Sequence, residues 1–221
     1  IWMNPEIDSA TGVPLGIAVA ELERALAEKP IAILLTEPGY LGTISDLPAL
    51  IKVAHQQKVP VILDAAWGGH FGFHPQLPQH AFQMGADALI TSTHKALPGY
   101  SASALLLART EFLSAERLEQ SFETTHTTSP AGAPLASIDG VRALLQTRGE
   151  ELIGALLENI HAFKESVQAE FALPIFLYPT DFPAGRFDPT KIVLRVQQLG
   201  ASGVEIEEDL QAAGIRVEMA D

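Results

Sequence analysis

The sequence predicts an α/β protein with a mostly parallel sheet flanked by helices, followed by the start of a small α+β domain. Short apolar runs alternate with segments of helical spacing, which is typical of parallel strands joined by right-handed crossovers. The runs at 60–63 and 86–90 are each followed by polar residues, as expected where buried parallel strands open onto a ligand crevice. Beyond Phe171 four prolines mark a change of composition, which predicts a second unit.

The elements of the first unit follow from the spacing of apolar residues and from turn and capping residues. Val19, Leu22, Ala25 and Leu26 share one helical face, and Ser45 with Asp46 is typical of a helix cap. A helix is also expected between the second and third strands. We predict helices at 17–28, 46–57, 111–122, 135–148 and 150–170, and strands at 31–36, 60–63, 86–90 and 103–108.

The remaining residues predict a β-α-β piece, with strands at 191–196 and 215–218 around a helix at 203–213. We therefore divide the chain into three parts. Residues 1–148 form part of a large domain, residues 149–172 a connecting helix, and residues 173–221 the beginning of a small C-terminal domain.

The composition narrows the classes of function. The chain has 221 residues, of which 47% are hydrophobic, enough for a substantial core. Its net charge of −13 disfavours binding to nucleic acid or to anionic membranes, which requires clustered Lys and Arg. The absence of cysteine excludes disulfides, thiolate zinc sites and thiol catalysis. No apolar run of membrane-spanning length and no signal-like start are present, so we expect a cytoplasmic protein.

The candidate site lies where the two central strands end. Asp64 closes one strand, and Ser92, His94 and Lys95 follow the next. Pyridoxal 5′-phosphate (PLP) needs an amine that holds its aldehyde as a Schiff base and an anion against its pyridine nitrogen. Hydroxyl, imidazole and backbone N–H groups suit its phosphate. The ordinary alternatives are a capping Asp and a solvated surface Lys.

Two other constellations deserve comparison. His70, His74 and His80, together with Asp64, have the residue types of a metal site. The surrounding Phe, Gly and Pro residues disfavour the helix that the spacing of His70 and His74 would need. A triad of Ser92, His94 and Asp64 lacks the Gly-x-Ser-x-Gly turn of serine hydrolases. We therefore expect no metal site and no serine triad.

The run from Thr91 to Pro98 resembles the Ser-x-His-Lys signature of the Orn/Lys/Arg decarboxylases, bacterial basic amino acid decarboxylases of PLP fold type I. Further segments are similar to this family in the same order along nearly the whole chain. They are residues 5–8 (Pro-Glu-Ile-Asp), 12–17, 37–46 (Glu-Pro-Gly-Tyr-Leu-Gly-Thr-Ile-Ser-Asp), 70–75 (His-Phe-Gly-Phe-His-Pro), 127–130 (Thr-Thr-Ser-Pro) and 188–191 (Asp-Pro-Thr-Lys).

The resemblance implies roles for individual residues. Lys95 would form the Schiff base with PLP, Asp64 would pair with the pyridinium nitrogen, and Ala66 would pack on the ring. Ser92 and His94 would contact the phosphate. The catalytic set would then be Lys95, Asp64 and His94, with His94 or Lys95 returning the proton to the substrate carbon.

A second set of residues carries weaker implications. Thr127, Thr128 and Ser129 resemble the segment that reaches an active site near a dimer interface. Two places depart from the family pattern. Residues 64–67 read Asp-Ala-Ala-Trp where many members have Asp-Glu-Ala-His, and residues 131–134 replace the expected aromatic and bulky residues.

The resemblance implies PLP-dependent decarboxylation of lysine, arginine or ornithine to a polyamine-type amine, by a homo-oligomer, a dimer or larger. It also implies that this chain is a fragment, because the family's phosphate-binding loop and the residue that stacks on the cofactor lie before the position of Ile1. The alternatives are a non-catalytic fragment, an aminotransferase or aldolase of the same fold type, and a metal hydrolase.

Overall fold

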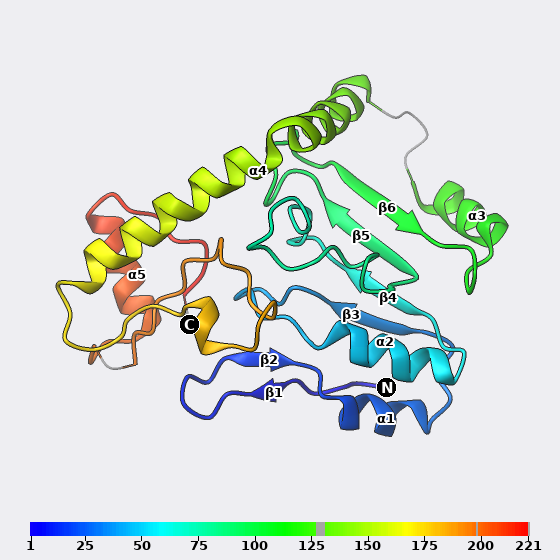
Figure 1. Cartoon of the computed structure of the whole chain (residues 1–221), viewed down its shortest axis with the longest axis horizontal. Coiled ribbons are helices and arrows are strands. Elements are labelled where there is room, and N and C mark those ends of the chain that lie inside the picture. The colour runs from blue at the N-terminus through cyan, green and yellow to red at the C-terminus, as the bar shows by residue number, and fades with distance from the viewer. Residues whose placement is uncertain (127–130, 198, 221) are drawn as a thin grey trace.

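The computed structural model describes residues 1–126, 131–197 and 199–220. Figure 1 shows a sheet with short helices beside it and one long helix running across the molecule. The elements in order are β1 (Glu6–Ile7), β2 (Pro14–Gly16), α1 (Val19–Leu26), β3 (Ile33–Thr36), α2 (Leu47–Gln56), β4 (Val61–Asp64), β5 (Ala88–Ser92), β6 (Ala104–Ala108), α3 (Ala115–Thr125), α4 (Gly132–Gln168), the 3-10 helix η1 (Pro179–Asp181) and α5 (Gly203–Ala212).

The main sheet has the strand order β3-β4-β5-β6 (Figure 1). β3, β4 and β5 are parallel, as predicted, whereas β6 is antiparallel to β5. The sheet is therefore mostly parallel, as expected, with one antiparallel strand at its edge. The connection across residues 93–103 contains no helix. A parallel strand would need a longer crossover connection, so the chain reverses and β6 runs antiparallel to β5.

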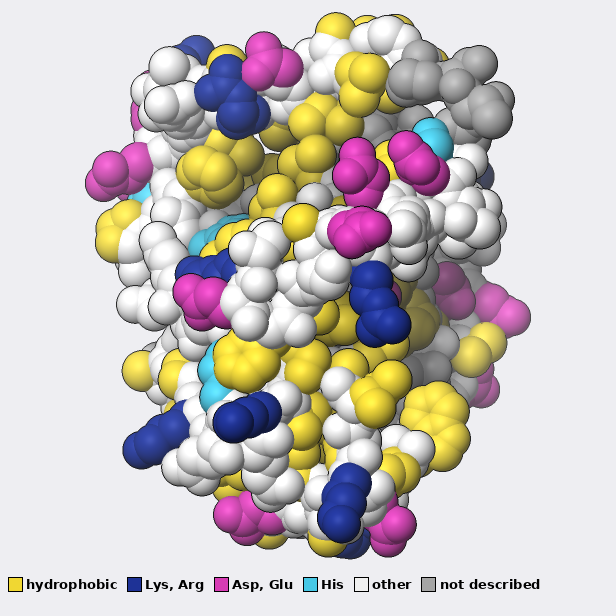
Figure 2. Space-filling view, turned by 90° about the vertical axis from the view of Figure 1, so that its right-hand side faces the viewer, with side chains coloured by type: hydrophobic (Ala, Val, Ile, Leu, Met, Phe, Trp, Pro, Cys, Tyr) yellow, Lys and Arg dark blue, Asp and Glu magenta, His cyan; other side chains and the backbone are white. Residues whose placement is uncertain are grey.

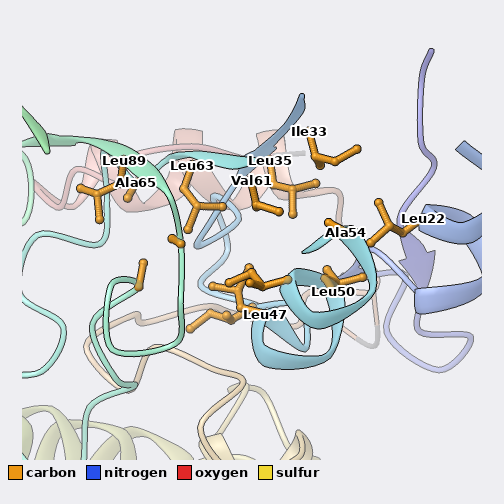
Figure 3. Close-up of a cluster of buried hydrophobic side chains, with 14 of the residues drawn as sticks. Leu22, Ile33, Leu35, Leu47, Leu50, Ala54, Val61, Leu63, Ala65 and Leu89 are labelled. Atoms are coloured by element: carbon orange, nitrogen blue, oxygen red, sulfur yellow. The ribbon is translucent and has the colours of Figure 1, made fainter. Parts of the chain in front are cut away.

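The core lies between one face of this sheet and the helices α1 and α2 (Figure 3). Leu22 of α1 and Leu50 of α2 are fully buried against Val61 and Leu63 of β4. The predicted cap of α2 is confirmed, because Asp46 Oδ1 accepts a hydrogen bond from the Ala49 amide at 3.2 Å. These helices fix the positions of the strands, and hence of the polar residues at the strand ends.

The opposite face of the sheet is only partly covered. Leu34, Ile90 and Leu106 are 67%, 42% and 43% exposed, although their neighbours along each strand are more buried. Side chains alternate between the faces of a strand, so Asp64, which pairs with Ile90 in register, lies on this open face. Hydrophobic side chains also gather between charged groups on the side of the molecule drawn in Figure 2.

Three predicted helices differ from the structure. Residues 65–87 form turns instead of a crossover helix, because glycine and proline recur there. The helices predicted at 135–148 and 150–170 form the single helix α4, which continues through Gly149. Gly149 is buried inside the helix and packs beside Phe73 of the turn region, so this glycine does not end the helix.

The C-terminal part differs more from the prediction. The helix predicted at 203–213 is confirmed as α5, with Ser202 and Glu205 forming a capping box. Residues 191–196 contribute only an isolated bridge between Phe176 and Leu194, and residues 215–218 form no strand. A strand needs a partner along its length, and the described residues offer these segments little pairing. The hairpin β1–β2 was not predicted, and the three-part division of the chain remains a prediction.

Among the described residues, no helix is both long enough and apolar enough to cross a membrane. The segment after α4 folds back onto the first part of the chain. Leu177 and Phe187 are buried with Val13, and the Ile44 amide donates to the Arg186 carbonyl oxygen at 3.0 Å. This packing brings residues 186–191 next to the loop after β3.

Candidate functional site

Asp64 is the last residue of β4 and lies half-buried on the open face of the sheet. Its Oδ1 accepts a hydrogen bond from the Ala66 amide at 3.1 Å, which turns the chain immediately after the strand. Its carbonyl oxygen accepts from the Glu37 amide at 2.9 Å. The carboxylate is therefore held by its own turn, and Ala66 is a half-buried residue of minimal size beside it.

Ser92 and His94 stand at the end of β5. Ser92 is buried, and its Oγ lies 2.9 Å from His94 Nδ1. The same ring nitrogen donates to the Ser103 carbonyl oxygen at 2.9 Å, because a carbonyl oxygen can only accept. The other ring nitrogen, Nε2, makes no hydrogen bond to any described residue. The imidazole is thus oriented through Nδ1, and Nε2 is its atom available to a ligand.

The turns after β4 and β5 lie directly against each other. A Cβ on Gly69 would come within 3.0 Å of both the Ser92 carbonyl oxygen and Leu97 Cδ1. Thr91 Oγ1 donates to the Ala65 carbonyl oxygen at 3.0 Å. Gly69 therefore lies at a close approach of the two turns, and the two strand ends that carry Asp64 and Lys95 form one edge of the site.

Lys95 is exposed and contacts Trp67, the third residue after Asp64. Its Nζ lies 5.3 Å from the centroid of the Trp67 ring. A second ammonium group, that of Lys191, lies 3.8 Å from the same centroid, and Tyr40 meets the ring edge-on at 5.6 Å. Sequence reasoning missed Lys191 as a site residue. The only sequence feature that pointed to Lys191 was the similarity of residues 188–191, Asp-Pro-Thr-Lys, to the decarboxylase family.

A buried polar cluster consists of His70 with Asp188 and Thr190, which lie just before Lys191 in the sequence. His70 Nε2 lies 3.2 Å from Asp188 Oδ1, and the amide and hydroxyl of Thr190 both donate to that oxygen. Burial by itself would raise the pKa of the Asp188 carboxyl, but the hydrogen bonds from His70 and Thr190 hold it below its usual value. The cluster joins the turn after β4 to the segment that carries Lys191.

Glu37 is a second buried acid near Asp64. The amide and hydroxyl of Ser45 both donate to its carboxylate. Burial raises the pKa of Glu37 to about 7, despite the opposing effect of these hydrogen bonds and of Arg186 nearby. It lines a small void with Ala65 and Gly68, inside the core and away from Lys95.

The residues of the alternative constellations lie apart. His70 is paired with Asp188, whereas His74 Nδ1 and His80 Nδ1 accept from the amides of Gln76 and Phe82. In the part of the chain that the structure describes, no three or more His, Cys, Asp or Glu residues are grouped to hold a metal ion. The Ser92–His94 pair is formed, but its Nδ1 faces the Ser103 carbonyl and not Asp64. The predicted segment Thr127, Thr128 and Ser129 lies outside the described residues.

Comparison with known proteins gives one consistent result. The family model for the Orn/Lys/Arg decarboxylase major domain matches residues 1–180. Arginine decarboxylase of Bacillus subtilis is 34% identical over 229 residues, covering 100% of this chain and 46% of that protein. Arginine decarboxylase of Halalkalibacterium halodurans is 33% identical over 233 residues, with the same two coverages. The chain therefore spans about half the length of these relatives.

Solved structures show the same fold. The constitutive lysine decarboxylase of E. coli superposes with a TM-score of 0.75 at 21% identity, covering 100% of this chain and 38% of that one. A ureidoglycine–glyoxylate aminotransferase of Bacillus subtilis superposes with a TM-score of 0.65 at 16% identity, covering 93% and 56%. The architecture is that of the PLP-dependent enzymes of fold type I, as the sequence predicted.

Proposed function

Because the chain belongs to the Orn/Lys/Arg decarboxylase family, we propose that it carries the lysine and aspartate of a PLP-dependent decarboxylase of basic amino acids. The substrate would be lysine, arginine or ornithine, and the products the corresponding amine and carbon dioxide. One observation carries the proposal most directly. The turns that bear Asp64 and Lys95 leave neighbouring parallel strands and pack against each other at Gly69.

The residues present fit the chemistry of PLP. Lys95 supplies an exposed amine, Asp64 a carboxylate at a strand end, and Ala66 a small surface beside it. Ser92, the last residue of β5, supplies a hydroxyl, and His94 supplies an imidazole nitrogen on the tight loop that follows. A Cβ on Gly99 would collide with the Thr93 carbonyl oxygen, so the loop that follows Lys95 is also closely packed.

Each residue then has a defined task. Bound PLP would supply an electron sink for the bond to the carboxylate. Lys95 would hold the cofactor aldehyde and exchange it for the substrate amine. Asp64 would keep the ring nitrogen protonated, which maintains the sink, while Ala66 would pack on the ring. Ser92 and His94 would hold the phosphate.

The last step requires a proton on the carbon that lost its carboxylate. Lys95 or His94 would supply it, because both stand on the loop after β5. His94 would act through Nε2, since Nδ1 is engaged by the Ser103 carbonyl. Assembly as a homo-oligomer, a role in polyamine biosynthesis and a cytoplasmic location remain predictions from the family resemblance and the composition.

The experiment measures carbon dioxide and keto-acid release from lysine, arginine and ornithine, with PLP added. Carbon dioxide with little keto acid is expected for a decarboxylase, whereas keto acid indicates an aminotransferase. Asp64→Ala should abolish turnover without unfolding the chain, and Asp139→Ala, at an exposed position on α4, should not. Appreciable decarboxylation by Asp64→Ala would refute the role of Asp64. Wild-type protein that releases neither product would support a non-catalytic chain.

A further inference from the structure

Lys191 is a second cation at the site, and the roles of the other site residues leave it without a task. We propose that the Lys191 ammonium binds the α-carboxylate of the amino acid substrate beside the Trp67 ring. This inference deepens the proposed function and rests on it, because it assigns the part of the substrate that Lys191 recognises. Ligand binding without turnover tests the role of Lys191 separately from the proposed decarboxylase function.

The Lys191 ammonium group lies at the same aromatic ring as that of Lys95. Both Lys95 Nζ and Lys191 Nζ lie within 5.3 Å of the centroid of one indole ring, that of Trp67. A substrate whose α-amine is at Lys95 carries its α-carboxylate on the same carbon, and in this proposal that carboxylate is directed to the second cation at the Trp67 ring. A carboxylate there would meet a charge-assisted donor and an aromatic surface.

Lys191 also lacks a direct ion-pair partner among the described residues. Lys191 is half-buried, yet in the described part of the chain no carboxylate oxygen lies within 4.0 Å of its Nζ. Asp188, three residues before it, is engaged by His70 and Thr190. A partly desolvated cation without a direct anionic partner is unfavourable, and an anionic group of a ligand would relieve it.

The electrostatic surroundings agree with this. Burial lowers the pKa of Lys191, and the positive charge of Lys95 lowers it further, against the opposing effects of Asp188 and Glu218. An anion bound between the two lysines would oppose this lowering of the pKa, because it favours the charged form of each amine.

Hydrogen bonds of the backbone fix Lys191 in place. Its amide donates to the Asp188 carbonyl oxygen at 3.1 Å. Its own carbonyl oxygen accepts from the Nζ of Lys164, a buried residue of α4, at 3.0 Å. On the other side, Gly42 adopts φ +97, and a Cβ there would come within 2.7 Å of Lys191 Cγ. The side chain therefore lies in a slot that a larger residue at position 42 would close.

The surroundings also provide room for the rest of a substrate. A cavity of about 380 Å³ is lined by Lys191, Tyr40, Leu41 and Glu218, among other residues. An extended amino acid is small enough for such a space. The carboxylate end would lie at Lys191, near Lys95, and the remainder could extend along the cavity.

The test compares ligands that differ only by the α-carboxylate: arginine with agmatine, lysine with cadaverine, and ornithine with putrescine. Their binding is followed by Trp67 fluorescence in a Trp2→Phe background, since these are the two tryptophans of the chain. Measurements are made without cofactor and with deoxypyridoxine phosphate, a cofactor analogue without the aldehyde, so that no turnover occurs. The variants are Lys191→Met, Lys191→Arg and, as a matched control, Lys52→Met at an exposed position of α2.

For at least one pair, wild type should bind the amino acid about tenfold or more tightly than the amine. Lys191→Met should lose this preference, whereas Lys191→Arg and Lys52→Met should retain it. A preference that survives Lys191→Met, or no preference in wild type, overturns the inference. Weaker binding of the phosphate analogue by Lys191→Met, with the preference intact, assigns Lys191 to phosphate and also overturns it. A preference that depends on Lys191 in a chain that forms no Schiff base with PLP would contradict the proposed function alone.

Discussion

Glu37 provides a quantitative test of the buried polar structure beside the site. Burial raises the pKa of its carboxyl from 4.5 to about 7 in the folded protein. The folded state therefore prefers the neutral acid, and its stability is greatest below the unfolded pKa. As pH rises from about 4.5 through about 7, this contribution is lost, because the unfolded chain ionises more easily. The displacement of the pKa corresponds to about 3 kcal/mol, at about 1.4 kcal/mol per pH unit.

The substitution Glu37→Gln removes the titration but keeps the size and one carbonyl acceptor for Ser45. We expect the glutamine variant to gain stability relative to wild type by about 2 to 3 kcal/mol between pH 5 and pH 8. Urea unfolding at both pH values measures this gain. Glu28→Gln, at an exposed position, is the control and should show no comparable dependence. A stability difference between Glu37→Gln and wild type that is equal at the two pH values would refute the reasoning.

Two further substitutions test the support of Lys191. Asp188→Ala should destabilise the chain by about 3 to 5 kcal/mol in urea unfolding, because it leaves the buried His70 without its partner. Asp139→Ala should change the unfolding midpoint little, and a small effect of Asp188→Ala would contradict the account. Gly42→Ala should destabilise more than Gly185→Ala in the same assay. Both glycines have positive φ, but only Gly42 would also meet Lys191, so equal losses would rule out the contact.

Much of the first part of the fold could be predicted from the sequence. Strands β3, β4 and β5 are short apolar runs bounded by turn residues, and these local signals survive in the structure. The cap at Asp46 is equally local. The direction of β6 was not accessible in this way, because it depends on whether the chain crosses over after Lys95. Gly149 misled the helix prediction, because it lies buried inside α4 and packs beside Phe73 instead of ending a helix.

The candidate site also combines residues that local sequence signals predict with residues that only tertiary packing brings in. Asp64, Ser92, His94 and Lys95 follow strand ends, so sequence order alone predicted their grouping at one edge of the sheet. Lys191 could not be placed by such reasoning, since it reaches Trp67 through the packing of residues 186–191 on the loop after β3. The pairing of His70 with Asp188 likewise joins residues 118 positions apart. Such contacts follow from tertiary packing, which no local pattern encodes.

The absorbance spectrum of the purified chain with added PLP, recorded before and after borohydride reduction, tests the central claim most directly. Wild type and a Lys52→Ala control should both show a visible band. Reduction should remove this band, because it converts the Schiff base to a stable secondary amine. Lys95→Ala should lack this band, because no amine would remain at the end of β5 to hold the aldehyde. The absence of a band in wild type, or an unchanged band in Lys95→Ala, would contradict the assignment of Lys95 as the residue that binds the cofactor.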